Sequence, residues 1–503
     1  MKKESRGRKA IVNTIVGLSY ELVALICGLV ITRLILSNFG SAYNGITSSI
    51  TQFISCISLL RAGIGGVTRA ALYKPLAEND TEGISIIIGQ TERFMQKVAM
   101  IFLFAIILFA CLYPFLISDE FDWLFSSSLI LIISLTTFAQ YFFGITYQLL
   151  LEADQKLWIV SFVNGVGLIA NAIISAILIY LSDSIHVVKL GSSFVFVLSS
   201  VFLYLYARKK YGIIKTKETK ENKLIQKWDA LAHEVAHFAN TNTDVIILTF
   251  FTSLSTISVY TIYALVTLNL RKTIKNFTLS FGSSFGNMKA MGQNELIESN
   301  FRLFEVIVFS VVSILFSTTL PMITPFVLLY TKGVYDVDYN QPIFGLIMVL
   351  VGVFDCTRIP YETVVKSFGY YKQTRNGAIF EAVFHIILSV VLTYKFGLIG
   401  VAIGGMFAIA YRSYQFVCFL SKKIIHRKLS IYITHILFTL IIMFICTCLY
   451  RVLFQAASDV NTWILQTLFI FVISSLLTGL KNIFLYKKES LILYNKIKSY
   501  RHE

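Results

Sequence analysis

Basic side chains interrupt stretches of this sequence that are otherwise apolar enough to cross a membrane. A charge at the bilayer centre costs about 2.5 to 3.5 kcal/mol on insertion scales, so the helix faces that carry these residues must meet water, a protein partner or an anionic ligand. We therefore expect a cationic cavity inside a membrane protein. The residues are Arg33, Arg61, Arg271, Lys272, Lys275, Arg358 and Arg412.

Acidic residues lie in the same stretches. Asp355, Arg358 and Glu362 follow one helix face at i, i+3 and i+7, and Glu381 and His385 form an i, i+4 pair. Carboxylates in membrane helices often bind the protons or sodium ions of coupled transporters, and the alternative is an ion pair that fixes helix packing. Two further candidates for ion coupling are Asp244, which follows a polar run, and Glu21 in the first apolar stretch.

One short motif suggests a different chemistry. His233, Glu234 and His237 fit H-E-x-x-H, in which two histidines on one helix face hold zinc and the glutamate acts as the base of a metalloprotease. The nearest third ligand is Asp244, on the same predicted helix, where the geometry is awkward for zinc. We expect no bound metal and a polar helix start, with an intramembrane zinc protease as the remote alternative.

The composition indicates a membrane protein. Of 503 residues, 56% are hydrophobic and 14% are charged. The apolar stretches are mostly about 20 to 27 residues long, which is the length that a tilted helix needs to cross a bilayer. We predict an all-α polytopic fold with about fourteen transmembrane helices, at 10–36, 45–71, 94–117, 123–150, 157–181, 186–207, 228–253, 257–283, 301–329, 342–367, 374–395, 397–420, 429–451 and 462–484.

The connections between these spans set the predicted orientation. One set of alternate connections holds roughly 30 Lys and Arg and the other roughly 3, which is a strong positive-inside signal. This asymmetry accounts for the net charge of +16 without nucleic acid as a partner. Both termini are predicted to be cytoplasmic, in a multi-pass protein of the plasma membrane.

A basic segment separates two groups of six spans. The predicted domains are an N-terminal lobe at 1–207, a cytoplasmic linker at 208–227, a C-terminal lobe at 228–422, and two further helices with a basic tail at 423–503. A weak sequence echo supports an internal repeat, because the stretch from Tyr147 to Tyr180 resembles that from Tyr361 to Tyr394. The pattern favours two six-helix lobes related by a pseudo-two-fold repeat around a central site.

The glycines do not predict a nucleotide site. Gly400 and Gly404 lie in an apolar helix at a spacing that is typical of close helix contact. No P-loop is present, so the sequence predicts no ATP hydrolysis and no cofactor.

Several segments resemble the Wzx-type oligosaccharide flippases, of the superfamily that also contains lipid II flippases and multidrug and toxin extruders. They are TRLILSNFG at 32–40, YNG at 43–45, RAGIG at 61–65, RAALYKPLAEND at 69–80 and NTDVIIL at 242–248.

The resemblance implies transport of a lipid-linked oligosaccharide from the cytoplasmic to the outer leaflet, by alternating access of two lobes. A polyprenyl diphosphate substrate requires cations, which the basic residues above and Arg69 would supply, because arginine binds two phosphate oxygens at once. Candidate sugar contacts on the fourth span are Gln140, Tyr141, Tyr147 and Gln148. A monomer that passes its product to a polysaccharide polymerase is expected, and the main alternative is an exporter of drugs or organic cations with the same fold.

Overall fold

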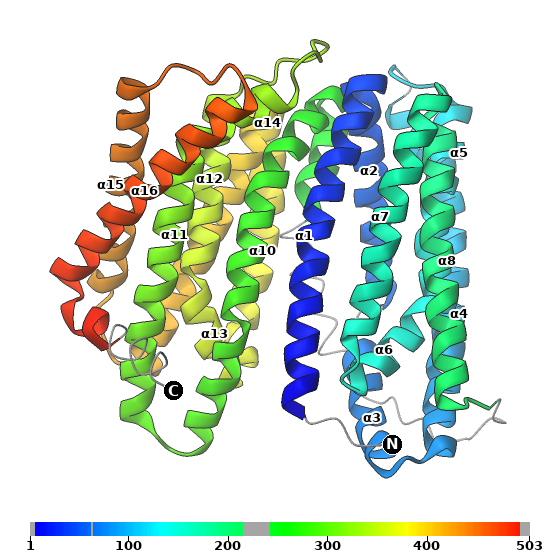
Figure 1. Cartoon of the computed structure of the whole chain (residues 1–503), viewed down its shortest axis with the longest axis horizontal. Coiled ribbons are helices and arrows are strands. Elements are labelled where there is room, and N and C mark those ends of the chain that lie inside the picture. Colours follow the sequence, from blue (N-terminus) through cyan, green and yellow to red (C-terminus); the bar gives the residue numbers. More distant parts are fainter. Residues whose placement is uncertain (1–5, 62–63, 118, 215–241, 493–503) are drawn as a thin grey trace. The chain divides into compact units, whose positions relative to one another are not determined.

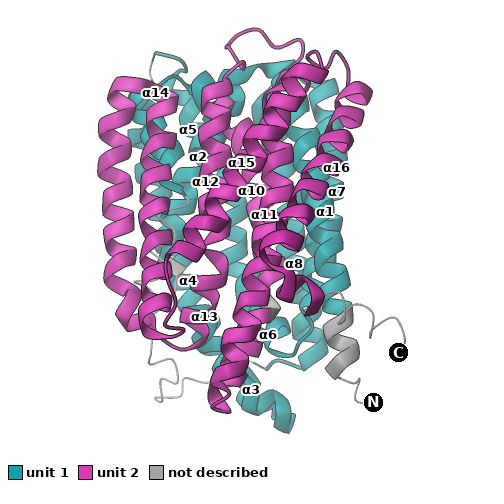
Figure 2. Cartoon of the chain, turned by 90° about the vertical axis from the view of Figure 1, so that its left-hand side faces the viewer, with its two compact units in different colours: residues 1–258 teal, residues 259–503 magenta. Residues whose placement is uncertain are grey.

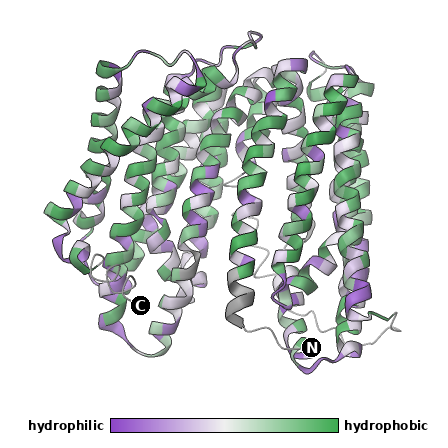
Figure 3. Cartoon of the chain, viewed as in Figure 1, coloured by the Kyte–Doolittle hydropathy of each residue, from purple (hydrophilic) through white to green (hydrophobic). Residues whose placement is uncertain are grey.

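The chain is an all-helical membrane protein. Its computed structural model describes residues 6–61, 64–117, 119–214 and 242–492, with the side chains of 6–11, 60–61 and 279–280 also outside the description. Within the described residues there is no β-strand, and ten helices are long and apolar enough to cross a membrane. Apolar residues run along most of their length in Figure 3. The predicted all-α polytopic fold is confirmed.

The other predicted spans are accounted for by shorter, bent or more polar helices. One of the ten helices, α14 (Tyr371–Lys423), contains two predicted spans. Three further spans correspond to the broken helix at 41–78, the short helix Asn242–Phe251, and α10 (Leu254–Ala290), in which basic residues lower the hydropathy.

The chain divides into two compact units, Met1–Ser258 and Val259–Glu503, which Figure 2 shows in separate colours. In unit 1, α7 packs against both α1 and α8, and α5 packs against α4 and α8 (Figure 1). Its elements are α1 (Arg6–Phe39), α2 (Ser41–Ile57), the 3-10 turn η1 (Ser58–Arg61), α3 (Ile64–Glu78), α4 (Thr81–Leu112), the 3-10 turn η2 (Tyr113–Leu116), α5 (Trp123–Ala139), the π-helical turn η3 (Gln140–Gly144), α6 (Ile145–Ala153), α7 (Leu157–Leu181), α8 (Ile185–Tyr211) and the helix Asn242–Phe251.

The helix Asn242–Phe251 packs within unit 1. The hydroxyls of Ser49 on α2 and Thr249 lie 2.7 Å apart, and a Cβ added to Gly45 would strike the carbonyl of Leu254. The predicted linker at 208–227 lies mostly outside the described residues, so the predicted lobe boundaries stay a prediction.

In unit 2, α11 is the central helix, since it packs against α12, α15 and α16, while α12 also packs against α14. After the start of α10, the elements are α11 (Asn294–Tyr330), α12 (Pro342–Thr357), α13 (Ile359–Ser367), α14, α15 (Ser430–Leu453) and α16 (Val460–Leu485).

A sharp turn divides α14 where two spans are predicted to meet. Gly397 has φ +52° and ψ −127°, a conformation that a residue with a Cβ rarely adopts. The two halves then pack closely, because a Cβ on Gly400 would strike the Leu392 carbonyl and one on Gly404 would strike Ser389. The predicted spans 374–395 and 397–420 and the close-packing role of both glycines are confirmed.

The prediction of one continuous helix at 45–71 is wrong. Helix α2 ends at Ile57, the 3-10 turn η1 follows to Arg61, and α3 begins at Ile64. The closely spaced glycines Gly63, Gly65 and Gly66 weaken helix propensity here, which an apolar count does not register. In a membrane such irregular backbone is tolerated only inside protein or beside a water-filled cavity.

Candidate functional site

A network of charged side chains connects four helices of unit 2, α10, α12, α13 and α14. Arg271 on α10 contacts one oxygen of Asp355 on α12, with Nε at 2.6 Å and Nη2 at 2.5 Å. The other oxygen of Asp355 accepts from Arg358 Nη2 at 2.7 Å. Asp355 therefore bridges two of the arginines that interrupt the apolar sequence.

The network continues into α14 through Glu381. Arg358 Nη1 lies 3.0 Å from one oxygen of Glu381, and Arg412 Nε lies 3.3 Å from the other. Arg412 also donates to the carbonyl of Thr374 at 3.0 Å and to the side chain of Gln415. Both halves of α14 are thus tied to the same carboxylate.

The end of α12 places Arg358 at the centre of this network. Pro360 lacks an N–H and cannot donate to the preceding turn, so α12 ends at Thr357 and α13 starts at Ile359. The predicted ladder is present in spite of the junction, because Arg358 Nε lies 3.4 Å from Glu362, which also pairs with Lys366 at 2.5 Å.

The charges of the network nearly balance. Three arginines and Lys366 face three carboxylates, and the side chains of Glu381 and Arg412 are only 4% and 7% exposed. Burial of charges at this depth is costly unless each is paired and hydrogen-bonded. Carboxylates therefore neutralise three arginines of the predicted cationic cavity, Arg271, Arg358 and Arg412. Lys272 and Lys275 on α10 are exposed.

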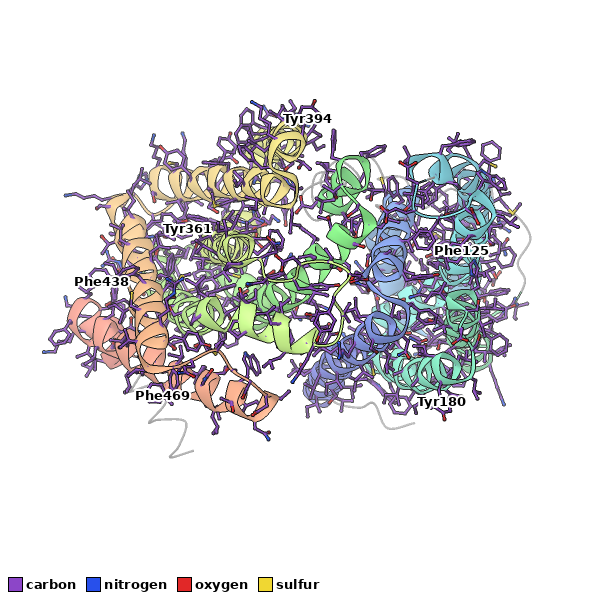
Figure 4. All side chains as sticks on the ribbon, turned by 90° about the horizontal axis from the view of Figure 1, so that it is seen from above. Phe125, Tyr180, Tyr361, Tyr394, Phe438 and Phe469 are labelled. Carbon is purple, nitrogen blue, oxygen red and sulfur yellow. The ribbon has the colours of Figure 1, made fainter. Side chains whose placement is uncertain are left out.

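A second buried cluster in unit 2 lies near the connection between α14 and α15. Arg427 binds both oxygens of Glu305 on α11, at 2.5 and 2.6 Å, and the Tyr361 hydroxyl donates to the same carboxylate. Burial disfavours the charged guanidinium, but the contacts with Glu305 outweigh it and raise the pKa of Arg427 above its ordinary value. Figure 4 shows Tyr361 among the helices of this unit, and Tyr394 at its edge. Sequence reasoning missed this cluster, although Glu305 in a predicted span was a signal.

Two of the predicted site residues in unit 1, Arg69 and Gln148, contact the same glutamate. Arg69 on α3 pairs with Glu152 on α6 at 2.6 Å, and Gln148 donates to the same glutamate at 3.0 Å. The Arg69 side chain is 40% exposed and Gln140 is also exposed.

The two tyrosines proposed as sugar contacts lie in the core of unit 1 instead. Tyr141 and Tyr147 are 2% and 0% exposed. Tyr141 donates to the carbonyl of Ser58 at 3.2 Å, which joins the π-helical turn of the fourth span to the break after α2. π-Helical turns are frequent at functional sites, and this one contacts the 3-10 turn Ser58–Arg61 at its first residue.

The remaining predicted residues lie on helices of both units. Glu21 and Arg33 lie partly exposed on α1, Asp244 is partly exposed, and His385 is buried on α14. The structure does not describe the side chain of Arg61. The H-E-x-x-H motif at 233–237 lies outside the described residues, and no group of His, Cys, Asp and Glu suited to a metal occurs in the part that is described.

A polar seam between α2 and the segment 242–258 was not predicted. Asn44 donates to Ser258 at 2.8 Å, Gln52 donates to Asn242, and the hydroxyls of Ser49 and Thr249 lie 2.7 Å apart. The amides in the predicted second span were the available signal, because interhelical hydrogen bonds hold membrane helices together.

Solved structures share this fold. The chain matches "Lipid II flippase MurJ, inward closed conformation" with a TM-score of 0.69 and 16% identity, over 95% of this chain and 99% of that one. It matches an inward-facing multidrug resistance MATE family transporter of the MOP superfamily with a TM-score of 0.61 and 15% identity, over 81% and 98%. A MOP superfamily transporter from Pyrococcus furiosus, described by a reversed polarity of its binding pocket, matches with a TM-score of 0.53 and 13% identity, over 84% and 96%.

No protein-family model and no curated protein matches the sequence. At these identities the solved structures establish the fold alone. This chain is accordingly a multi-pass membrane protein with the fold of the MurJ and MATE transporter structures.

Proposed function

We propose that this protein is a flippase that moves a lipid-linked oligosaccharide, a polyprenyl diphosphate that carries sugars, from the cytoplasmic to the outer leaflet by alternating access. It lies in the plasma membrane with both termini in the cytoplasm, acts as a monomer without a cofactor, and passes its product to a polysaccharide polymerase. The extent of the fold shared with MurJ supports this class of substrate.

The observation that carries the proposal is the run of ion pairs from Arg271 through Asp355, Arg358 and Glu381 to Arg412. Each arginine is held by a carboxylate, so the helices stay together when no substrate is bound. A diphosphate also presents two oxygens to the planar guanidinium, with more negative charge, and can take an arginine from its carboxylate. An exchange of partners gives the network two arrangements, which a substrate-driven change between two states requires.

The neighbouring lysines favour an anionic substrate. Lys272 and Lys275 are exposed one helix turn or less from Arg271 on α10. With Lys366 they give this region more positive than negative charge, so a phosphate gains from the field and an organic cation is repelled.

Export of an organic cation is the second candidate, because MATE transporters share the fold and Asp355 and Glu381 would supply acidic groups. Both carboxylates are already paired with arginine. Cation binding would have to break these pairs and leave the arginines without partners, which is costly at this depth.

Flipping in proteoliposomes tests the proposal. The chain is reconstituted with a fluorescent lipid-linked oligosaccharide, and the fraction that reaches the opposite leaflet is measured with an impermeant lectin. The wild type should flip this lipid and should not move a fluorescent organic cation. Arg271→Gln and Arg412→Gln should each reduce flipping at least about tenfold, as expected for one lost charge-assisted contact with phosphate.

Arg302→Gln is the matched control, because Arg302 pairs with Glu298 on an exposed face of α11, with 52% and 44% of the two side chains exposed. It should flip at the wild-type rate. Cation transport without lipid flipping would favour the second candidate. Full flipping in Arg33→Ala, Arg61→Ala and Arg271→Ala would exclude the cationic-cavity mechanism.

A further inference from the structure

A cavity of about 610 Å³ lies at one end of unit 2, away from the charged network. It is formed where α11 ends, where α15 ends, and by the connection that leads to α16. In Figure 1 the connections that follow α11 and α15 lie at the same end of this unit. By the positive-inside prediction, this end faces the outer leaflet.

Two cations line this cavity although the outer side has few. Few basic residues are expected on the outer side, and Lys332, Lys395 and Arg451 are among them. Lys332 and Arg451 both line the cavity. None of the described residues that line it is acidic. With no acidic residue in the described lining, Lys332 and Arg451 give this cavity a net positive charge, which favours an anionic ligand.

The rest of the lining suits a lipid. Leu328, Leu329 and Phe454 provide an apolar wall, while Asn340 and Ser458 add groups that can donate to an oxygen. A free inorganic anion would leave the apolar wall without a contact, and an uncharged lipid would leave the two cations without one. The lining combines the two requirements of a lipid with a phosphate head group.

Aromatic residues place the cavity at the depth of a membrane interface. Tyr450 lines it, and Trp463 on α16 packs against Phe326 with 5.3 Å between ring centroids. Tyr and Trp concentrate where the hydrocarbon core meets the head groups. A lipid could therefore place its phosphate between Lys332 and Arg451 without leaving its leaflet.

We propose that this cavity is a binding site for an outer-leaflet lipid with a negatively charged phosphate head group. Lys332 and Arg451 bind the phosphate, and the first carbons of the hydrocarbon chain pack against Leu328 and Phe454. The site is separate from the arginine network and does not require the proposed flippase function. A glycerophospholipid or a polyprenyl phosphate could supply this chemistry.

Native mass spectrometry of the detergent-purified full chain tests the site. Phosphatidylglycerol and polyprenyl phosphate are titrated separately, with diacylglycerol and polyprenol as their uncharged counterparts. Wild-type protein should bind at least one of the phosphate lipids more tightly than its uncharged counterpart. Lys332→Gln and Arg451→Gln should each weaken that binding about tenfold, and the double variant more. The phosphate lipid that these variants bind more weakly than the wild type does is the ligand of the site.

Lys395→Gln is the matched control, since Lys395 is another outward cation, is exposed, and does not line the cavity. It should bind both phosphate lipids as the wild type does. Thermal unfolding of each variant verifies that the exposed substitutions leave the fold intact. Unchanged binding of both lipids by the double variant, or an equal loss in Lys395→Gln, would overturn the proposal whether or not the chain flips an oligosaccharide.

Discussion

The hydroxyl of Tyr361 donates to the carboxylate of Glu305 from a position with no exposed surface. The same pairing recurs in unit 1, where Tyr147 donates to Glu92 on α4 at 3.4 Å and is equally buried. Both tyrosines begin the sequence echo between the two halves of the chain. Each follows an interruption in the fourth span of its half by three residues, at Gly144 and at Arg358.

The repeat therefore extends from sequence to side-chain contacts. An arginine that follows the sixth span completes each cluster, with Arg427 bound to Glu305 and Arg208 close enough to Glu92 to interact electrostatically. The second cluster is tighter, because Arg427 is bidentate whereas Arg208 donates to Tyr204.

This difference predicts unequal stability losses. Tyr361→Phe removes a donor to a fully buried carboxylate and should lower the free energy of unfolding by about 1 to 3 kcal/mol. Tyr147→Phe loses a longer hydrogen bond and should cost less. Thermal unfolding of both variants in the same detergent measures the difference, and equal or reversed losses would contradict the ranking of the two clusters.

The turn inside α14 gives a second stability prediction. Gly400→Ala places a methyl group against the Leu392 carbonyl and should cost about 1 to 3 kcal/mol, as overpacking does. Gly479→Ala in α16 is the control, because no atom lies within 4 Å of the added Cβ. It should be neutral or slightly stabilising, since alanine is the better helix former. Equal melting temperatures for the two variants would show that the halves of α14 pack less closely than described.

The sequence was sufficient to predict the fold because the length of apolar stretches and the bias of basic residues reflect the bilayer directly. The division of α14 into two spans at 395–397 was predicted for the same reason, whereas Gly397 was expected inside a helix and not at the turn. The break after Ile57 was not predicted, because apolar composition continues through it.

The partners of the arginines required the structure. Asp355 and Arg358 are three residues apart, so their pairing follows from spacing, but Arg271 is 84 residues from Asp355 in sequence. The sequence also did not distinguish the lipid-facing side of the fourth span from its protein-facing side. A membrane helix is apolar toward lipid and toward protein, so periodicity could not place Tyr147 in the core.

The network predicts that Arg271 depends on Asp355. Asp355→Asn leaves Arg271 and Arg358 with a weaker acceptor and should reduce both stability and flipping. The double variant Arg271→Gln with Asp355→Asn should regain stability relative to Asp355→Asn, because no unpaired charge remains, but should not regain flipping if the guanidinium binds phosphate. Unfolding and flipping measured on the same preparations separate the two roles, and recovery of both would show that the pair is purely structural.

The motif at 233–237 predicts bound zinc only if the protein is a metalloprotease. We expect purified protein to contain less than stoichiometric zinc by elemental analysis, and His233→Ala to flip lipid at the wild-type rate. A chelator should leave flipping unchanged for the same reason. Stoichiometric zinc that is lost together with activity in His233→Ala would replace the flippase proposal with the metalloprotease.

Asp244 is the candidate for coupling to an ion gradient. It lies on the short helix Asn242–Phe251, in the part of unit 1 that hydrogen-bonds to α2, and it is only partly exposed. A carboxylate that binds a proton or sodium during transport loses this ability when it becomes an amide of the same shape. Asp244→Asn should therefore abolish the acceleration of flipping by an imposed proton or sodium gradient, while flipping without a gradient remains. Asp183→Asn, at the α7–α8 connection, is the control and should keep the acceleration, so an equal response of the two variants to the gradient would exclude Asp244 as the coupling residue.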